Sequence, residues 1–444
     1  MRINISIPDN NIKERKYSIL ALMDLILDKS KVEYVFEIAS GSDHTCISIN
    51  DKEINFIDAF WNKYPKDLTY LSIENLPEPI YGSNDFAPEP DIPIIYGDNR
   101  IFVSKNKIEC GIDVFASTFF MLTRWEEFVN PQRDTHNRFP GIKSIAVKYG
   151  FIERPIVNEY AIMVRNMFYA LELPEETTIK RKFKLIPTHD IDRMRFYNLR
   201  NLAGDIIKRK SFRLFYRNLI NSINNPFDRF QFLMDQSEKY NLKSHFYFMA
   251  SHSRNIRDYE YYINSNIFKE RIDEIYRRGH IIGFHPGYTT STDSKEWIIQ
   301  KNALSNKTPD PIVEGRQHFL MMTIPETLQI WNDNGMLIDS TLGYYDHIGF
   351  RCGTGDSFHI FNFISRNELV LKERPLVVMD GTLKQYMNLS IDDARKRVFN
   401  LINISKKYQT SMTILFHNSS FCNEWKDYLG LYESILDFAC NQSE

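Results

Sequence analysis

From Lys182 onward, short apolar runs alternate with longer stretches that have the apolar periodicity of amphipathic helices. Strands are predicted at residues 183–188, 244–249, 281–284, 312–320, 337–341, 376–379 and 412–416. Helices are predicted at residues 226–240, 259–278, 293–304, 325–334 and 391–408. This alternation is typical of an α/β fold with a parallel sheet and helical crossovers. About seven such units predict that the sheet closes into a barrel.

The first part of the chain has a different rhythm. We interpret residues 1–175 as a smaller α+β domain, and residues 182–444 as a second domain. Strands are predicted at residues 2–7, 32–38, 46–49 and 52–56, with a helix at residues 17–28. Residues 76–93, rich in Pro, Asn, Asp and Gly, predict a loop. Residues 113–128 predict a helix whose aromatic face belongs to the core or to a domain interface.

Composition and charge narrow the class of protein. The formal net charge is −2, which argues against a dedicated nucleic-acid binder. The basic stretch at residues 208–217 is interpreted as the solvated face of a helix. Five widely spaced cysteines without a CxxC pair are expected to be reduced thiols in a cytoplasmic protein. Neither a signal peptide nor a membrane span is predicted.

Polar side chains follow several of the predicted strands. Asp190 and Asp192 end the strand that begins near residue 183, and at spacing i, i+2 they point the same way. One carboxylate could bind a cation while the other acts as a base, although Asp pairs are also common in turns. His285, His318 and His417 follow or end three further strands. Because such ends converge on one face of a parallel barrel, these residues predict metal-assisted hydrolysis.

Residues from about 183 to 420 resemble the polysaccharide deacetylases, that is, the NodB-homology or carbohydrate esterase family 4 proteins. The resemblance rests on THDID at 188–192, RRGHIIGFHPGY at 277–288 and LFHN at 415–418. RQHFL, DSTLGY and GFRCGT are similar to one branch of that superfamily. In the first half, DVFASTFFMLTRWEEF and RDTHNRFP look like the N-terminal domain of unknown function that accompanies this branch.

The resemblance implies a distorted (β/α)7-type barrel that removes an N- or O-acetyl group from a carbohydrate. It implies that Asp190 is the general base and that Asp192 and His285 bind a divalent metal ion, with Zn²⁺ favoured. The family's second histidine ligand is replaced here by Thr289. We therefore expect His318 to supply the missing imidazole from the next strand; otherwise the metal is weakly bound or absent.

The resemblance assigns three further roles. His417 is expected to protonate the leaving group, and Arg351 to orient the base. Tyr288, Thr289 and Tyr344 are the candidates for substrate binding. The expected partner is a carbohydrate, with no nucleic acid, and the sequence does not indicate the oligomeric state.

Three functions remain open at this stage. The first is a carbohydrate N- or O-deacetylase, and the second is a related C–N hydrolase that acts on another acyl amide, such as a formyl group. The third is a binding protein that has kept the barrel and lost the metal. Thr289 keeps the third function open, whereas the retention of Asp190, Asp192 and His417 favours catalysis.

Overall fold

The computed structural model describes residues 1–194, 206–223, 225–250, 258 and 261–441. The N-terminal half is built on a six-stranded mixed sheet in the order β2-β1-β3-β4-β8-β7. Parallel pairs are β1 with β2 and β4 with β8, and the other neighbours are antiparallel. The strands are β1 (Arg2–Ile7), β2 (Glu33–Ile38), β3 (His44–Ile49), β4 (Lys52–Ile57), β7 (Gly97–Val103) and β8 (Lys107–Ile112).

Helices α1, α2 and α5 pack on one another in this half, and α3 and α4 are short. Their bounds are α1 (Ile12–Met23), α2 (Val114–Thr123), α3 (Trp125–Val129), α4 (Ile145–Lys148) and α5 (Ile156–Ala170). The segment predicted as one helix over residues 113–128 is two helices, because Arg124 adopts a left-handed conformation with φ 52°. The predicted loop at residues 76–93 contains a small antiparallel pair, β5 (Ile80–Gly82) with β6 (Ile92–Ile94).

The second half contains a nine-stranded sheet in the order β14-β15-β13-β12-β11-β10-β9-β17-β16. Neighbouring strands are parallel throughout, except that β14 is antiparallel to β15. The strands are β9 (Lys184–Ile191), β10 (His245–Phe248), β11 (Ile281–Phe284), β12 (Glu314–Gly315), β13 (Ile338–Asp339), β14 (Phe358–Asn362), β15 (Asn367–Glu373), β16 (Leu376–Met379) and β17 (Ser411–Leu415). The class is α/β, as expected.

The sheet curls without closing in the part of the chain that the structure describes. Its two edge strands, β14 and β16, are not hydrogen-bonded to each other. The loop between β13 and β14 covers the edge of β16, where the Gly349 amide donates to the carbonyl of Val377 at 2.9 Å. The arrangement is a curled half-barrel sheet, and the predicted (β/α)7 count is not confirmed.

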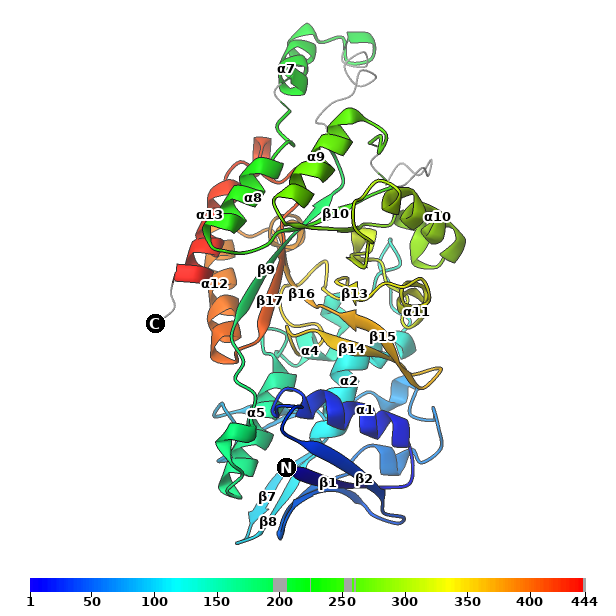
Figure 1. The fold of residues 1–444 in the computed structure, drawn as a ribbon, viewed down its shortest axis with the longest axis vertical. Helices are drawn as coiled ribbons and strands as arrows, with labels where there is room; N and C mark the ends of the chain where they lie inside the picture. Colours follow the sequence, from blue (N-terminus) through cyan, green and yellow to red (C-terminus); the bar gives the residue numbers. More distant parts are fainter. Residues whose placement is uncertain (195–205, 224, 251–257, 259–260, 442–444) are drawn as a thin grey trace.

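Helices follow most strands of this sheet, as a parallel sheet requires. They are α8 (Phe230–Lys239), α9 (Asn266–Arg277), α10 (Ser294–Ser305), α11 (Glu326–Asp333), α12 (Ile391–Lys407) and α13 (Tyr428–Asn441). Helix α7 (Phe212–Ile223) projects from the end of the molecule opposite the N-terminal sheet (Figure 1). This helix carries part of the basic stretch predicted as a solvated helix face. The aromatic side chains of Phe212 and Tyr216 on the same helix are also exposed. No described helix is long and apolar enough to cross a membrane.

One apolar core joins the two halves. Helix α2 packs against β14, and the Phe119 ring on α2 lies 5.5 Å from that of Phe361 on β14. Tyr17 on α1 packs on the same Phe361 ring at 4.9 Å and donates its hydroxyl to the carbonyl of His359 at 2.7 Å. The aromatic face predicted for residues 113–128 is therefore core and interface, and it holds the N-terminal half against the edge of the second sheet.

Candidate active site

The site is centred on β9, an interior strand of the second sheet that pairs with β10 and β17. Asp190 is the second-last residue of β9, and Asp192 directly follows the strand. Their side chains are 3 % and 18 % exposed. Because neighbouring strands run parallel, residues at their carboxyl ends meet these two carboxylates.

Asp192, His285 and His318 form a cluster in which the potential ligand atoms all lie within 4.8 Å of one another. Oδ1 of Asp192 is 3.3 Å from Nε2 of His285 and 3.8 Å from Nε2 of His318. His285 directly follows β11, and His318 lies in the turn after β12. The structure thus brings together the three residues expected to bind a metal.

The outer nitrogen of each imidazole is held by an acceptor. Nδ1 of His285 lies 2.7 Å from the carbonyl of Arg316, and Nδ1 of His318 lies 3.2 Å from Oδ1 of Asp258. These acceptors require the hydrogens on Nδ1, so the Nε2 lone pairs face Asp192. Nε2 of His285 and Oδ1 of Asp192 are buried without a hydrogen-bond partner. Two imidazoles and a carboxylate, with orphaned lone pairs turned inward, fit a divalent cation such as Zn²⁺.

Charge interactions in the cluster favour the ionised carboxylate. Burial by itself would raise the pKa of Asp192, but the contact with His285 and the charges of His318 and His417 hold that pKa well below its usual range. Burial lowers the pKa of the His285 imidazole, and the stronger effect of Asp190 and Asp192 raises it.

Arg316 holds the expected base. This fully buried arginine donates from Nη1 to Oδ1 of Asp190 at 2.8 Å and to the hydroxyl of Thr188 at 2.9 Å. Its Nε and Nη2 bond the carbonyl and hydroxyl of Ser340 at 2.8 and 3.0 Å. The guanidinium is therefore fixed on several sides, and one oxygen of Asp190 is fixed with it. The second oxygen remains turned towards His285, 3.7 Å away.

His417 lies on the other side of Asp192, with Nε2 3.8 Å from Oδ2 of that carboxylate. Its Nδ1 is 2.8 Å from Oδ1 of Asp380, whose other oxygen accepts the His417 amide at 2.8 Å. Burial opposes the charged imidazole, but Asp380 and the nearby Asp192 and Asp190 raise the pKa of His417 to about 10. An imidazole that is charged at neutral pH can donate a proton from Nε2.

Asp380 was missed in the sequence, although a signal for it exists. It directly follows the apolar strand β16, just as Asp192 follows β9. Arg316 belongs to the RQHFL motif, but the motif alone does not indicate its role. Asp258 lies 60 positions before His318 in the sequence, and no local pattern indicates their contact.

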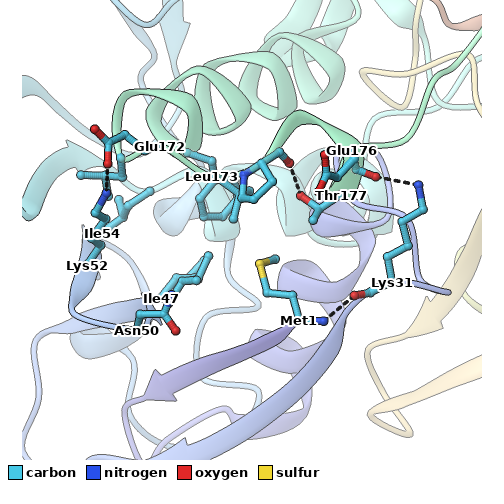
Figure 2. A pocket seen from close by; sticks show the side chains of 14 residues that line it. Met1, Lys31, Ile47, Asn50, Lys52, Ile54, Glu172, Leu173, Glu176 and Thr177 are labelled. Carbon is cyan, nitrogen blue, oxygen red and sulfur yellow. Dashed lines mark hydrogen bonds and ion pairs between the residues drawn. The ribbon is translucent and has the colours of Figure 1, made fainter.

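A pocket of about 130 Å³ opens onto these groups. Its lining includes Asp190, Asp192, His285, His318 and His417, with apolar side chains from Leu320, Met379 and Leu415. Arg138, from the N-terminal half, and Tyr386 complete part of the wall. A larger cavity of about 490 Å³ lies in the N-terminal half beside Ile47, Ile54 and Leu173 (Figure 2), and shares no lining residue with the first.

The structure does not place Arg351, the residue predicted to orient the base, beside Asp190. Its guanidinium is committed to Glu127, with Nε 3.0 Å from Oε1, and to the carbonyl of Gly343 at 2.8 Å. Arg316 occupies the place beside Asp190 instead. The reason is positional: Arg351 lies in the loop between β13 and β14 that faces the N-terminal half, whereas Arg316 follows β12 inside the sheet.

The three candidate substrate-binding residues do not line the pocket. Tyr344 is 4 % exposed, and its hydroxyl accepts from Arg124 at 2.9 Å, so burial in the interface overrides the predicted role. The Tyr288 hydroxyl lies 3.0 Å from Nδ1 of His136. Thr289 is exposed in the short turn after β11. Tyr345, next to Tyr344, faces Arg138 at the edge of the pocket.

A family model described as a family of unknown function (DUF7033) matches residues 3–172. No curated protein matches the chain. Among solved structures, a Mycobacterium smegmatis protein assigned to the polysaccharide deacetylases is 15 % identical, with a TM-score of 0.41 over 59 % of this chain and 85 % of that one. PuuE allantoinase is 10 % identical, with a TM-score of 0.40 over 59 % and 86 %.

A third solved structure is a carbohydrate esterase family 4 pseudoenzyme from Bacillus anthracis. It is 11 % identical, with a TM-score of 0.30 over 57 % of this chain and 61 % of that one. These three likenesses are distant in both sequence and shape.

Proposed function

We propose that the chain is a metal-dependent hydrolase that removes an N- or O-acetyl group from a carbohydrate, with residues 182–444 as its catalytic domain. The observation that carries the proposal is the arrangement around Asp192. His285 and His318 offer two inward lone pairs, Asp190 is fixed by Arg316, and His417 is fixed by Asp380. A ligand set, a separate base and a separate acid in one pocket are the parts that metal-assisted hydrolysis requires.

Asp192, His285 and His318 would hold the cation, which supplies polarisation of an acyl carbonyl and a water of lowered pKa. Asp190 lies beside this cluster without belonging to it, so its free oxygen can accept a proton from the attacking water. Arg316 donates a hydrogen bond to the other oxygen of that carboxylate and so fixes its orientation. The division of labour between Asp190 and Asp192 follows from their different partners.

His417 faces the cluster from the opposite side to His285 and is the proposed general acid. Asp380 fixes the hydrogen on Nδ1 and stabilises the imidazolium, so that Nε2 is the proton donor. When the acyl bond breaks, the leaving nitrogen or oxygen needs that proton. The pair of base and acid flanking the metal ligands thus suits both amides and esters.

The shape of the pocket favours a small acyl group. Its volume is about 130 Å³, and Leu320, Met379 and Leu415 form an apolar patch beside the acid and the base. A methyl group would gain from burial against such a patch. At the edge, the exposed ring of Tyr386 offers an apolar face on which a sugar could pack.

A C–N hydrolase acting on another small acyl amide, such as a formyl group, is the second candidate function. The same acid, base and ligand set would serve it, and only the apolar patch favours acetyl. A metal-free carbohydrate-binding protein is the third candidate, and the orphaned atoms of Asp192 and His285 argue against it.

The proposal is tested by measuring acetate and formate release from acetylated and formylated amino sugars, with the Zn²⁺-loaded chain and after chelation. We expect metal-dependent acetate release from at least one N- or O-acetylated sugar. Formate release alone would replace the first function by the second. Carbohydrate binding without turnover, unchanged by chelation, would replace both by the third.

A further inference from the structure

The turn that carries His318 has a strained backbone. Phe319 (φ 59°, ψ 11°) and Leu320 (φ 55°) are consecutive left-handed residues, and neither is glycine. Large side chains avoid this conformation because Cβ approaches the carbonyl oxygen too closely. Such a turn persists only where surrounding contacts hold it, and strained turns of this kind are concentrated at ligand sites. The contacts that hold this one therefore bear on how His318 is presented.

Some of those contacts come from the N-terminal half. Nη1 of Arg138 donates to the carbonyl of Phe319 at 3.2 Å, across 181 positions of sequence. The ring of His136 packs on the Phe319 ring, with centroids 4.9 Å apart. The Phe319 ring also lies 4.5 Å from the imidazole of His318 itself. Segment 134–138 thus contacts both the backbone and the side chain of Phe319 in the strained turn.

Segment 134–138 is folded on itself by hydrogen bonds of the Asp134 carboxylate. Oδ1 of Asp134 accepts the amides of His136 and Arg138, each at 2.8 Å, and its Oδ2 pairs with the Arg138 guanidinium at 2.7 Å. That guanidinium stacks on the Tyr345 ring, 3.7 Å from its centroid, and donates to the Tyr386 hydroxyl at 3.2 Å. Arg138 is only 5 % exposed, although it lines the pocket. Because segment 134–138 is held by several contacts, it can fix the conformation of the turn that it contacts.

We infer that segment 134–138 of the N-terminal half is a working part of the metal site, with Arg138 as the residue that positions His318. This inference rests on the proposed function, since it assigns a role toward the same cation. Arg138 touches no potential ligand atom and acts through the Phe319 carbonyl. The half matched by the family of unknown function would accordingly complete the site rather than form a separate module.

The test uses the full chain and measures Zn²⁺ affinity by competition with a chromophoric chelator. Arg138→Met removes the hydrogen-bond donors of the guanidinium and keeps an unbranched side chain. Because supporting contacts of this kind contribute roughly tenfold or more to metal affinity, we expect about tenfold weaker binding. Arg133→Met is the matched control: Arg133 belongs to the same loop but bonds the carbonyls of Asn130 and Glu127, and affinity should be unchanged.

A second readout separates positioning from a general loss of structure. With Co²⁺ at saturation, the visible absorption bands report ligand geometry, and they should change in Arg138→Met but not in Arg133→Met. Thermal unfolding shows whether each variant is folded. If Arg138→Met does not fold, Arg138→Lys takes its place, with a smaller expected loss of affinity, because a lysine cannot reproduce the planar fork.

The outcomes are distinguishable. Unchanged Zn²⁺ affinity and Co²⁺ bands in a folded Arg138 variant would overturn the inference and leave the proposed function standing. An equal loss in both arginine variants would also overturn it, because the effect would then belong to the loop as a whole. Absence of Zn²⁺ binding in the wild type would overturn the proposed function, and the inference with it.

Discussion

Two buried clusters of charge stand out in this molecule, and they differ in whether all of their carboxylate oxygens accept a hydrogen bond. One joins the halves: Arg124 and Arg351 bond Glu127, and Arg124 also bonds Glu126 at 2.8 Å. Every carboxylate oxygen in it accepts at least one hydrogen bond, the last from the Ile145 amide at 2.6 Å. The other cluster, around Asp192, leaves Oδ1 of that carboxylate buried and unbonded.

The difference separates a structural cluster from a candidate site. A buried carboxylate whose oxygens are all satisfied by arginines has no capacity left for a ligand, and its role is to fix two surfaces in register. A buried lone pair with no hydrogen-bond partner is costly, and a bound cation would satisfy it. Pairing, rather than the mere presence of charge, marks the site at Asp192.

Removing the base should have the largest effect. Asp190→Asn keeps the shape of the side chain but cannot accept the proton, so we expect kcat to fall by roughly 10³-fold. The Zn²⁺ content should stay at the wild-type value, because the proposed ligands are intact. Steady-state kinetics and elemental analysis on one preparation check both points. A variant with full activity would refute the assigned base.

Breaking the paired cluster should cost stability and leave the site intact. Glu127→Gln removes the carboxylate between two buried arginines, and we expect the free energy of unfolding to fall by about 3 kcal/mol. Denaturant unfolding measures this loss. The folded fraction should bind Zn²⁺ with wild-type affinity. A Glu127→Gln variant that keeps its stability but loses Zn²⁺ would contradict the structural role assigned to the Glu127 cluster.

The smallest expected effect tests the corrected role of Tyr344. Tyr344→Phe removes a hydroxyl that accepts from Arg124 at 2.9 Å, and we expect a loss of about 1 kcal/mol in stability. KM should not change, because the ring does not line the pocket. A rise in KM without a loss of stability would restore the substrate-binding role predicted from the sequence.

Local patterns predicted the strands well where burial alone determines them. Residues 281–284 and 376–379 are strands at those bounds. The strand predicted at residues 312–320 shrinks to Glu314–Gly315, because the Gln317 amide donates to the Thr341 hydroxyl rather than to a backbone carbonyl, and the chain turns at His318. Helix periodicity over residues 113–128 gave no sign of the break at Arg124, which is set by its buried partners.

The sequence indicated those site residues that lie near the end of a strand, and it did not indicate those that reach the site through tertiary contacts. Asp190 lies at the end of a strand, Asp192, His285 and His417 follow strands within two residues, and the structure places all four together. The choice between Arg316 and Arg351 could not be made from motifs, because it depends on which loop faces the N-terminal half. Arg138 contacts the site only through tertiary packing, and nothing near it in the sequence indicates that contact.

The most direct test of the account is the metal content of the purified wild type and of His285→Ala and His318→Ala, measured by elemental mass spectrometry. We predict close to one Zn²⁺ or similar divalent ion per chain in the wild type, and its loss in both variants. Metal retained by His318→Ala would contradict the proposed third ligand. A wild type that holds no metal even after reconstitution would contradict the hydrolase itself and favour a carbohydrate-binding protein.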